Sequence, residues 1–147
     1  MDDKHSQSSE LSIVLAIAIG GAIGSAARYA ITVAIPNPGA ASLPLATLVI
    51  NVSGSFLIGL FMVVALESPS ISVATRLFLT TGFCGGYTTM SAFSVDAERL
   101  LRENEFRRAA LYVLATTGTA LVATLAGMMT ARRLVAAMHT RRIHHAE

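Results

Sequence analysis

The chain has 147 residues, of which 53% are hydrophobic and 14% are charged, and its formal net charge is +2. Soluble domains carry about 25% charged residues, so this composition and a mean hydropathy of +0.60 argue against a water-soluble protein. The basic residues gather at the ends of apolar runs, which suits lipid head groups and not a nucleic acid. Cys84 is the only cysteine, which excludes an intrachain disulfide and a thiolate metal cluster.

Four long apolar runs predict an all-α membrane protein, because about 20 helical residues cross the hydrocarbon core. The chain begins with a polar tail, residues 1–10, which we expect to be disordered through position 9. The channel domain covers residues 11–131, and a basic tail at 132–147 is expected to fray. The four predicted spans cover about 11–35, 44–66, 71–98 and 109–130, and the third is broken.

The first span carries Gly20, Gly24 and Arg28 at intervals of four, which places them on one face of a helix. The two glycines form a small-xxx-small motif for close helix packing. Arg28 has two interpretations. It either extends to the membrane interface beside Tyr29, or it provides a cation at the mouth of an aqueous vestibule that attracts anions.

The second span carries a stripe of small and polar residues at intervals of four: Thr47, Asn51, Ser55 and Gly59. Asn51 is the least expected of these, because a primary amide is costly in lipid unless it is paired. It either ties two helices together by a hydrogen bond or offers its NH2 donors to a permeating anion.

Residues 82–96 (GFCGGYTTMSAFSVD) interrupt the third span with three glycines and five hydroxyl residues. The Gly85-Gly86 pair at membrane depth indicates an unwound point, because glycine disfavours a helix interior. The freed backbone groups then need protein, an ion or a water-filled cavity as partners. The alternative is an intact helix whose small residues permit close packing.

Residues 99–108 form a charged connector that we expect to be a solvated helical extension. The fourth span follows with Tyr112, Thr116 and Thr119 on one face. Such threonines often pack between helices or bond back to the carbonyl four residues earlier. The alternative is a track of hydroxyls that lines a pore.

Four spans place both termini and the turn at 67–70 on one side of the membrane. That side holds six Lys and Arg residues and the other holds five. Since this asymmetry sets the orientation of insertion, the balance predicts insertion in both orientations followed by antiparallel pairing. Four short spans also enclose too little volume for a pore, so we expect an oligomer.

No predicted span has a carboxylate near its centre, which weakens the alternative of a small proton-coupled exporter. No nucleophile–base pair, metal-ligand spacing or phosphate loop is visible, so an enzyme is not expected. What remains is hydroxyls, one amide, aromatic edges and one arginine. Neutral donors and positive ring edges can replace the hydration shell of a small anion without trapping it.

Three motifs resemble those of the Fluc (CrcB-type) fluoride channels. They are residues 20–29 (GGAIGSAARY), residues 47–59 (TLVINVSGSFLIG) and residues 82–96. The resemblance implies a passive channel that exports cytoplasmic fluoride to relieve its toxicity. It also implies a multi-pass protein of the cell inner membrane that forms an antiparallel, dual-topology homodimer with two pores. A structural Na+ would lie at the dimer centre, held by the backbone carbonyls of Gly85 and Thr88 from both subunits.

The same resemblance implies a set of residues along the fluoride pathway: Asn51, Phe93, Met90, Ser91, Thr47, Tyr112, Thr116 and, at the vestibule, Arg28. Three positions depart from the family pattern. Met90 stands where many members have a pore-lining phenylalanine, Ala92 where threonine is common, and Asp96 where glutamate is common. These departures keep open a second possibility, that the chain is one subunit of a heteromeric channel. A membrane-embedded subunit without transport activity is the third.

Overall fold

The computed structural model describes residues 2–36, 39, 42–68 and 71–144, and within these ranges the regular structure is helical throughout. Three helices are long: α1 (Asp2–Ala34), α2 (Leu45–Glu67) and α6 (Phe106–His144). The predicted third span is divided into four pieces. They are α3 (Val73–Leu77), the π-helix η1 (Phe78–Cys84), α4 (Gly85–Tyr87) and α5 (Met90–Arg102).

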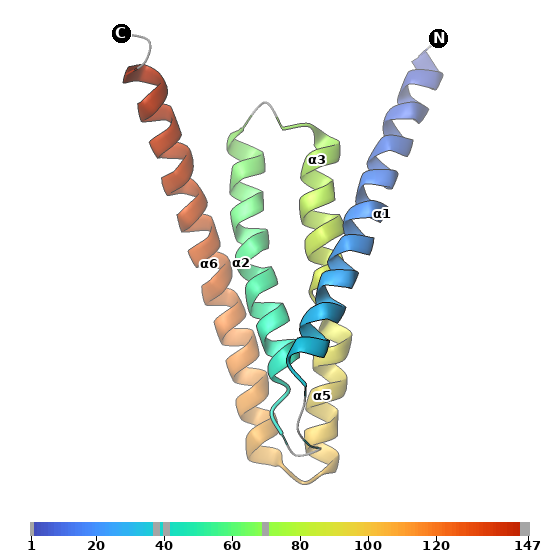
Figure 1. The fold of residues 1–147 in the computed structure, drawn as a ribbon, viewed down its shortest axis with the longest axis vertical. Helices are drawn as coiled ribbons and strands as arrows, with labels where there is room; N and C mark the ends of the chain where they lie inside the picture. Colours follow the sequence, from blue (N-terminus) through green and yellow to red (C-terminus); the bar gives the residue numbers. More distant parts are fainter. Residues whose placement is uncertain (1, 37–38, 40–41, 69–70, 145–147) are drawn as a thin grey trace.

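The chain passes up and down four times, so that both termini and the α2–α3 connection share one end of the molecule (Figure 1). Three of the described helices contain segments long and apolar enough to cross a membrane, namely Gln7–Ala34, Leu45–Glu67 and Phe106–Ala137. The fourth passage is made of the broken pieces, each too short to cross alone. The prediction of four membrane helices with a broken third is therefore confirmed.

Glycines allow two pairs of segments to approach closely. A Cβ on Gly24 of α1 would collide with the carbonyl of Phe83 in η1, and one on Gly86 of α4 would collide with the carbonyl of Gly21. A Cβ on Gly59 of α2 would likewise collide with the carbonyl of Thr124 in α6. The predicted glycine face of the first span is confirmed, and it holds the broken segment against α1.

The ends of α1 and α6 differ from the expectation of disordered tails. α1 already begins at Asp2, so the prediction of disorder is wrong for residues 2–9. Once a long apolar helix has formed, each added residue gains a backbone hydrogen bond without a new nucleation cost. α6 continues to His144, and its Ala131 and Val135 are buried, so the helix remains packed beyond the predicted span. Residues 145–147 lie outside the described ranges.

Large apolar side chains are exposed along the outer faces of the long helices. They include Leu15 and Ile19 of α1 and Leu114 and Leu125 of α6. An apolar outer surface on helices of this length suits a lipid environment, in which backbone groups bond within the helix and polar groups turn inward. The fold is that of a multi-pass membrane protein.

Candidate functional site

The helix break lies at Thr88 and Thr89, between α4 and α5. Both residues are extended, with φ −74° and ψ 157° at Thr88 and φ −148° and ψ 112° at Thr89. The Gly85-Gly86 pair is helical, so the prediction of unwinding at this pair is wrong. At Gly86 there is no room for a side chain, because α4 lies against the backbone of Gly21. This is the close packing that the alternative interpretation of the small residues expected.

Asn51 bonds to both backbone groups of the residue at the break. Its Nδ2 donates to the Thr89 carbonyl at 3.1 Å, and its Oδ1 accepts from the Thr89 N–H at 2.8 Å. Thr89 in turn caps α5, since its hydroxyl accepts from the Ala92 N–H at 3.1 Å. The interpretation of Asn51 as a tie between two segments is confirmed. One N–H of its amide group is not needed for these bonds, so a role toward an anion stays a prediction.

Arg28 contacts the broken segment just before the break. Its Nε donates to the Gly86 carbonyl at 3.1 Å, and the Ser25 hydroxyl reaches the same oxygen at 3.4 Å. The end of a helix exposes carbonyls with partial negative charge, which a cation stabilises. Spacing alone could not reveal this contact, because it depends on α1 lying beside α4.

The carbonyls of Gly85 and Thr88, which were predicted to hold Na+, lie at the break. The Cys84 carbonyl accepts from both the N–H and the hydroxyl of Thr88, each at 2.9 Å. Arg28 and Asn51 occupy those of Gly86 and Thr89. None of the hydrogen bonds described at the break uses the carbonyl of Gly85 or Thr88. Within the described part of the chain, a Cβ on Gly85 would meet nothing within 4 Å, so this side of α4 is open. Backbone carbonyls at a helix break suit an alkali cation.

A cavity of about 540 Å³ lies beside the break. It brings together six of the predicted site residues: Asn51, Gly85, Thr88, Met90, Phe93 and Thr116. Ser55, Thr80 and Thr124 also line it. Ser55 could be anticipated from its place on the Asn51 stripe. Thr80 gave no such signal, because the register of a π-helix is not visible in the sequence.

The other four predicted residues, Ser91, Thr47, Tyr112 and Arg28, are not among the residues that line this cavity. Ser91 is exposed at the start of α5, and its hydroxyl shares a hydrogen bond of 3.1 Å with the Thr89 hydroxyl. Tyr112 packs its ring against Phe93, with the ring centres 5.3 Å apart. Tyr112 therefore supports the wall of the cavity from behind.

Two groups of described hydroxyls on α6 differ in their partners. Those of Thr119, Thr124 and Thr130 bond back to carbonyls four residues earlier, as expected for threonines in an apolar helix. The hydroxyls of Thr116 and Tyr112 are buried and have no hydrogen-bond partner among the described residues. The Tyr112 hydroxyl lies near Thr47 and Asp96, but it does not reach hydrogen-bonding geometry with either. A buried donor without a partner is costly, so these two hydroxyls are the polar groups of α6 whose burial the described hydrogen bonds do not explain.

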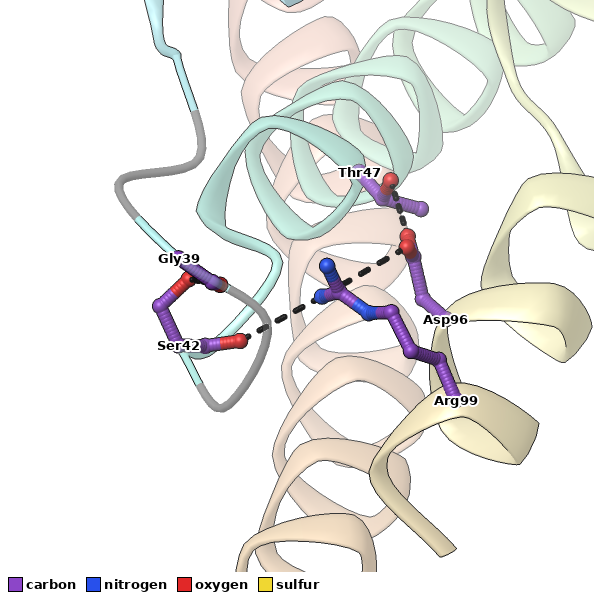
Figure 2. A network of polar contacts seen from close by, with 5 residues as sticks. All are labelled: Gly39, Ser42, Thr47, Asp96 and Arg99. Carbon is purple, nitrogen blue, oxygen red and sulfur yellow. Dashed lines mark hydrogen bonds and ion pairs between the residues drawn. The ribbon is translucent and has the colours of Figure 1, made fainter. Parts of the chain in front are cut away.

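A polar network lies on the side of Thr47 that faces α5 (Figure 2). The Thr47 hydroxyl donates to Asp96 Oδ2 at 2.7 Å, and Arg99 lies 4.0 Å from Asp96 Oδ1. Arg99 also donates to the Ser42 carbonyl at 3.4 Å. The sequence places Arg99 in the charged connector. Its separation from Asp96 by three residues, about one helical turn, is the one feature of the sequence that indicates an ion pair between them. Thr47 was expected to face fluoride, whereas its hydroxyl proton here is directed to a carboxylate.

These features define a small multi-span membrane protein in which a broken helix and uncharged polar side chains surround a cavity. Residues 15–128 match the family described as CrcB-like protein, Camphor Resistance (CrcB). The chain is 45% identical over 124 residues to the fluoride-specific ion channel FluC of Geobacter sulfurreducens. The aligned residues make up 84% of this chain and 100% of that relative. It is 42% identical over 119 residues to the FluC of Chlorobium chlorochromatii, which covers 81% of this chain and 92% of that relative. The chain belongs to the CrcB-like family.

Proposed function

We propose that this protein is a passive, fluoride-selective channel that exports cytoplasmic fluoride down its gradient. The observation that carries the proposal is the gathering of Asn51, Phe93 and Thr116 around one cavity beside the helix break, in a chain of the CrcB-like family. The relatives named above are fluoride-specific channels and align over nearly their whole length. An enzyme is not supported, since the family is one of ion channels.

The pathway offers fluoride uncharged partners in place of water. A small, strongly hydrated anion is the ligand that suits these partners: the second N–H of the Asn51 amide, the Thr116 hydroxyl and the positive ring edge of Phe93. Tyr112 adds a buried hydroxyl one turn away on α6. Neutral groups bind an anion firmly enough to draw it in and weakly enough to release it, which conduction requires. Met90, Ser91, Thr47 and Arg28 complete the proposed pathway toward its two ends.

A second copy of the chain is part of the proposal. The cavity is open on the side where Gly85 and Met90 are exposed, and Met90 has 72% of its surface accessible. An antiparallel copy placed there would close the cavity. It would also bring two further carbonyls to those of Gly85 and Thr88, giving four oxygens around a structural Na+. The ion would fix the two breaks to each other, and no fluoride step passes through it.

The charge balance supports a dimer of two oppositely oriented copies, and the family resemblance supports its location in the cell's inner membrane. Six positive residues on one side and five on the other give weak instruction to the insertion machinery, so both orientations are expected in the cell's inner membrane. Single cysteines placed in the C-terminal tail, in a variant that lacks Cys84, would be labelled from both sides. Labelling from one side only in every cell would reject dual topology.

The function is tested with purified protein in liposomes loaded with fluoride, using a fluoride electrode to follow efflux. We expect release of fluoride but not chloride, without a proton gradient. Release that requires a counter-gradient of protons would indicate an exporter instead. Silence of this chain alone, with release after co-expression of a homologous partner, would indicate a heteromeric channel. Silence in both cases would leave a subunit without transport activity.

The site is tested by Phe93→Leu, which keeps an apolar side chain and removes the ring edge. We expect fluoride efflux to fall by roughly three- to tenfold, the range of an aromatic interaction of about 1 kcal/mol. Gel filtration should still show the dimer, because Leu fills most of the same space. Unchanged efflux in Phe93→Leu would remove Phe93 from the pathway.

A further inference from the structure

The network of Thr47, Asp96 and Arg99 lies about one helical turn from the cavity residues Asn51 and Phe93, toward one end of the molecule. Thr47 lies one turn before Asn51 on α2, and Asp96 lies one turn after Phe93 on α5. The Ser42 carbonyl, next to the beginning of α2, receives the Arg99 guanidinium (Figure 2). On the proposed pathway, which includes Thr47, an anion that leaves the cavity toward this end would pass close to the Asp96 carboxylate, because that carboxylate is bonded to Thr47.

A carboxylate at this position presents a charge of the same sign as the anion. The Thr47 hydroxyl bonds to one carboxylate oxygen at 2.7 Å, and the Arg99 guanidinium lies 4.0 Å from the other. The side chains of Asp96 and Arg99 are 21% and 31% exposed, so water screens their charges only in part. Among the residues that the structure describes, Arg99 is therefore the cation that lies within ion-pair distance of the Asp96 carboxylate.

We propose that Arg99 is a positioning residue that sets the rate of fluoride entry at this mouth of the pathway. It offsets the charge of Asp96 and helps to hold the carboxylate in its bond with Thr47, so that the approaching anion meets a smaller negative charge. Its bond to the Ser42 carbonyl holds the guanidinium in place between α5 and the start of α2. This inference rests on the proposed fluoride channel, and it assigns a role to a residue outside the cavity.

The first test compares Arg99→Gln with the wild type in the fluoride-efflux assay. We expect efflux to fall by about three- to tenfold, because an uncompensated charge within several ångströms raises the energy of an approaching anion. The deficit should shrink as the concentration of an impermeant salt rises, since salt screens partly exposed charges. Arg99→Lys should recover most of the efflux. A purely structural loss would not respond to salt.

The matched control is Arg102→Gln on the same helix. The Arg102 side chain is 80% exposed and pairs with Glu98 on the outer surface, so removing its charge should leave efflux within about twofold of the wild type. An equal loss in Arg102→Gln and Arg99→Gln would show that the effect is one of general charge, and would overturn the proposal.

The second test places Arg99→Gln in an Asp96→Asn background. If Arg99 acts through the carboxylate, Arg99→Gln should change efflux by less than about twofold there, relative to Asp96→Asn alone. The same loss in both backgrounds would overturn the proposal. Wild-type protein that releases no fluoride would instead reject the channel itself. Normal wild-type efflux with an unaffected Arg99→Gln rejects only the role of Arg99.

Discussion

Asn51 and Thr89 are joined by two hydrogen bonds, and the pair replaces the backbone bonds that the helix break removes. The Asn51 amide donates at 3.1 Å and accepts at 2.8 Å, matching the N–H and carbonyl of one residue at once. In a membrane, water is not available to satisfy such backbone groups. The break at Thr88 and Thr89 is therefore stable because a side chain from another helix completes it.

We expect Asn51→Ala to destabilise the protein, because it leaves both backbone groups of Thr89 without a partner. Unsatisfied buried groups cost about 1–3 kcal/mol each, so the melting temperature in detergent should fall by roughly 5–10 °C. Fluoride efflux should fall as well, through loss of the amide donor.

Ser55→Ala is the control for the stability measurement. Ser55 lies one turn further along α2 and lines the same cavity, but no described hydrogen bond involves its hydroxyl. Its melting temperature should remain within about 2 °C of the wild type. Equal melting temperatures for Asn51→Ala and the wild type would show that the break does not depend on this pair.

Gly86 and Gly85 are neighbours with opposite surroundings. A Cβ on Gly86 would collide with the carbonyl of Gly21, whereas one on Gly85 would meet nothing within 4 Å in the described chain. We expect Gly86→Ala to reduce the yield of folded protein, since overpacking costs about 1–3 kcal/mol and a rigid backbone yields little. Gly85→Ala should fold normally and weaken the dimer, as shown by gel filtration at decreasing protein concentration. A folded, dimeric Gly85→Ala that is as stable as the wild type would argue against a second copy at this surface.

The sequence allowed much of this fold to be predicted, and the reasons differ between features. Long apolar runs and helical spacing were sufficient for four passages and for the glycine face of α1, because both depend on local periodicity. The exact position of the break was not predictable. It depends on Gly86 packing against Gly21 and on Asn51 reaching Thr89, which are contacts between segments far apart in sequence. The roles of Arg28 and Arg99 were missed for the same reason.

Sodium should stabilise the protein if the carbonyls of Gly85 and Thr88 hold it at the dimer centre. A ligand at 100 times its dissociation constant adds about 2.7 kcal/mol to the free energy of unfolding. We therefore expect a higher melting temperature in NaCl than in equal concentrations of N-methylglucamine chloride. The increase should be smaller in Gly85→Ala, whose added methyl group disturbs the site. The same melting temperature in both salts, at every concentration, would rule out a stabilising Na+.

Met90 lines the cavity with an exposed side chain, at a position where the resemblance to the fluoride channels led us to expect a phenylalanine. A thioether is polarizable but lacks the positive ring edge of an aromatic side chain. We expect Met90→Phe to raise fluoride efflux by about threefold, because a second ring edge beside Phe93 lowers the energy of the dehydrated anion. Chloride efflux should remain absent, since the change adds no charge.

The matched variant is Met129→Phe, which adds the same ring to an exposed position of α6 that does not line the cavity. If both variants raise efflux equally, the effect comes from the membrane surface and the site of Met90 has no special role. If Met90→Phe slows efflux, the cavity is already filled to its limit, and the thioether is the better partner for the ion in this chain.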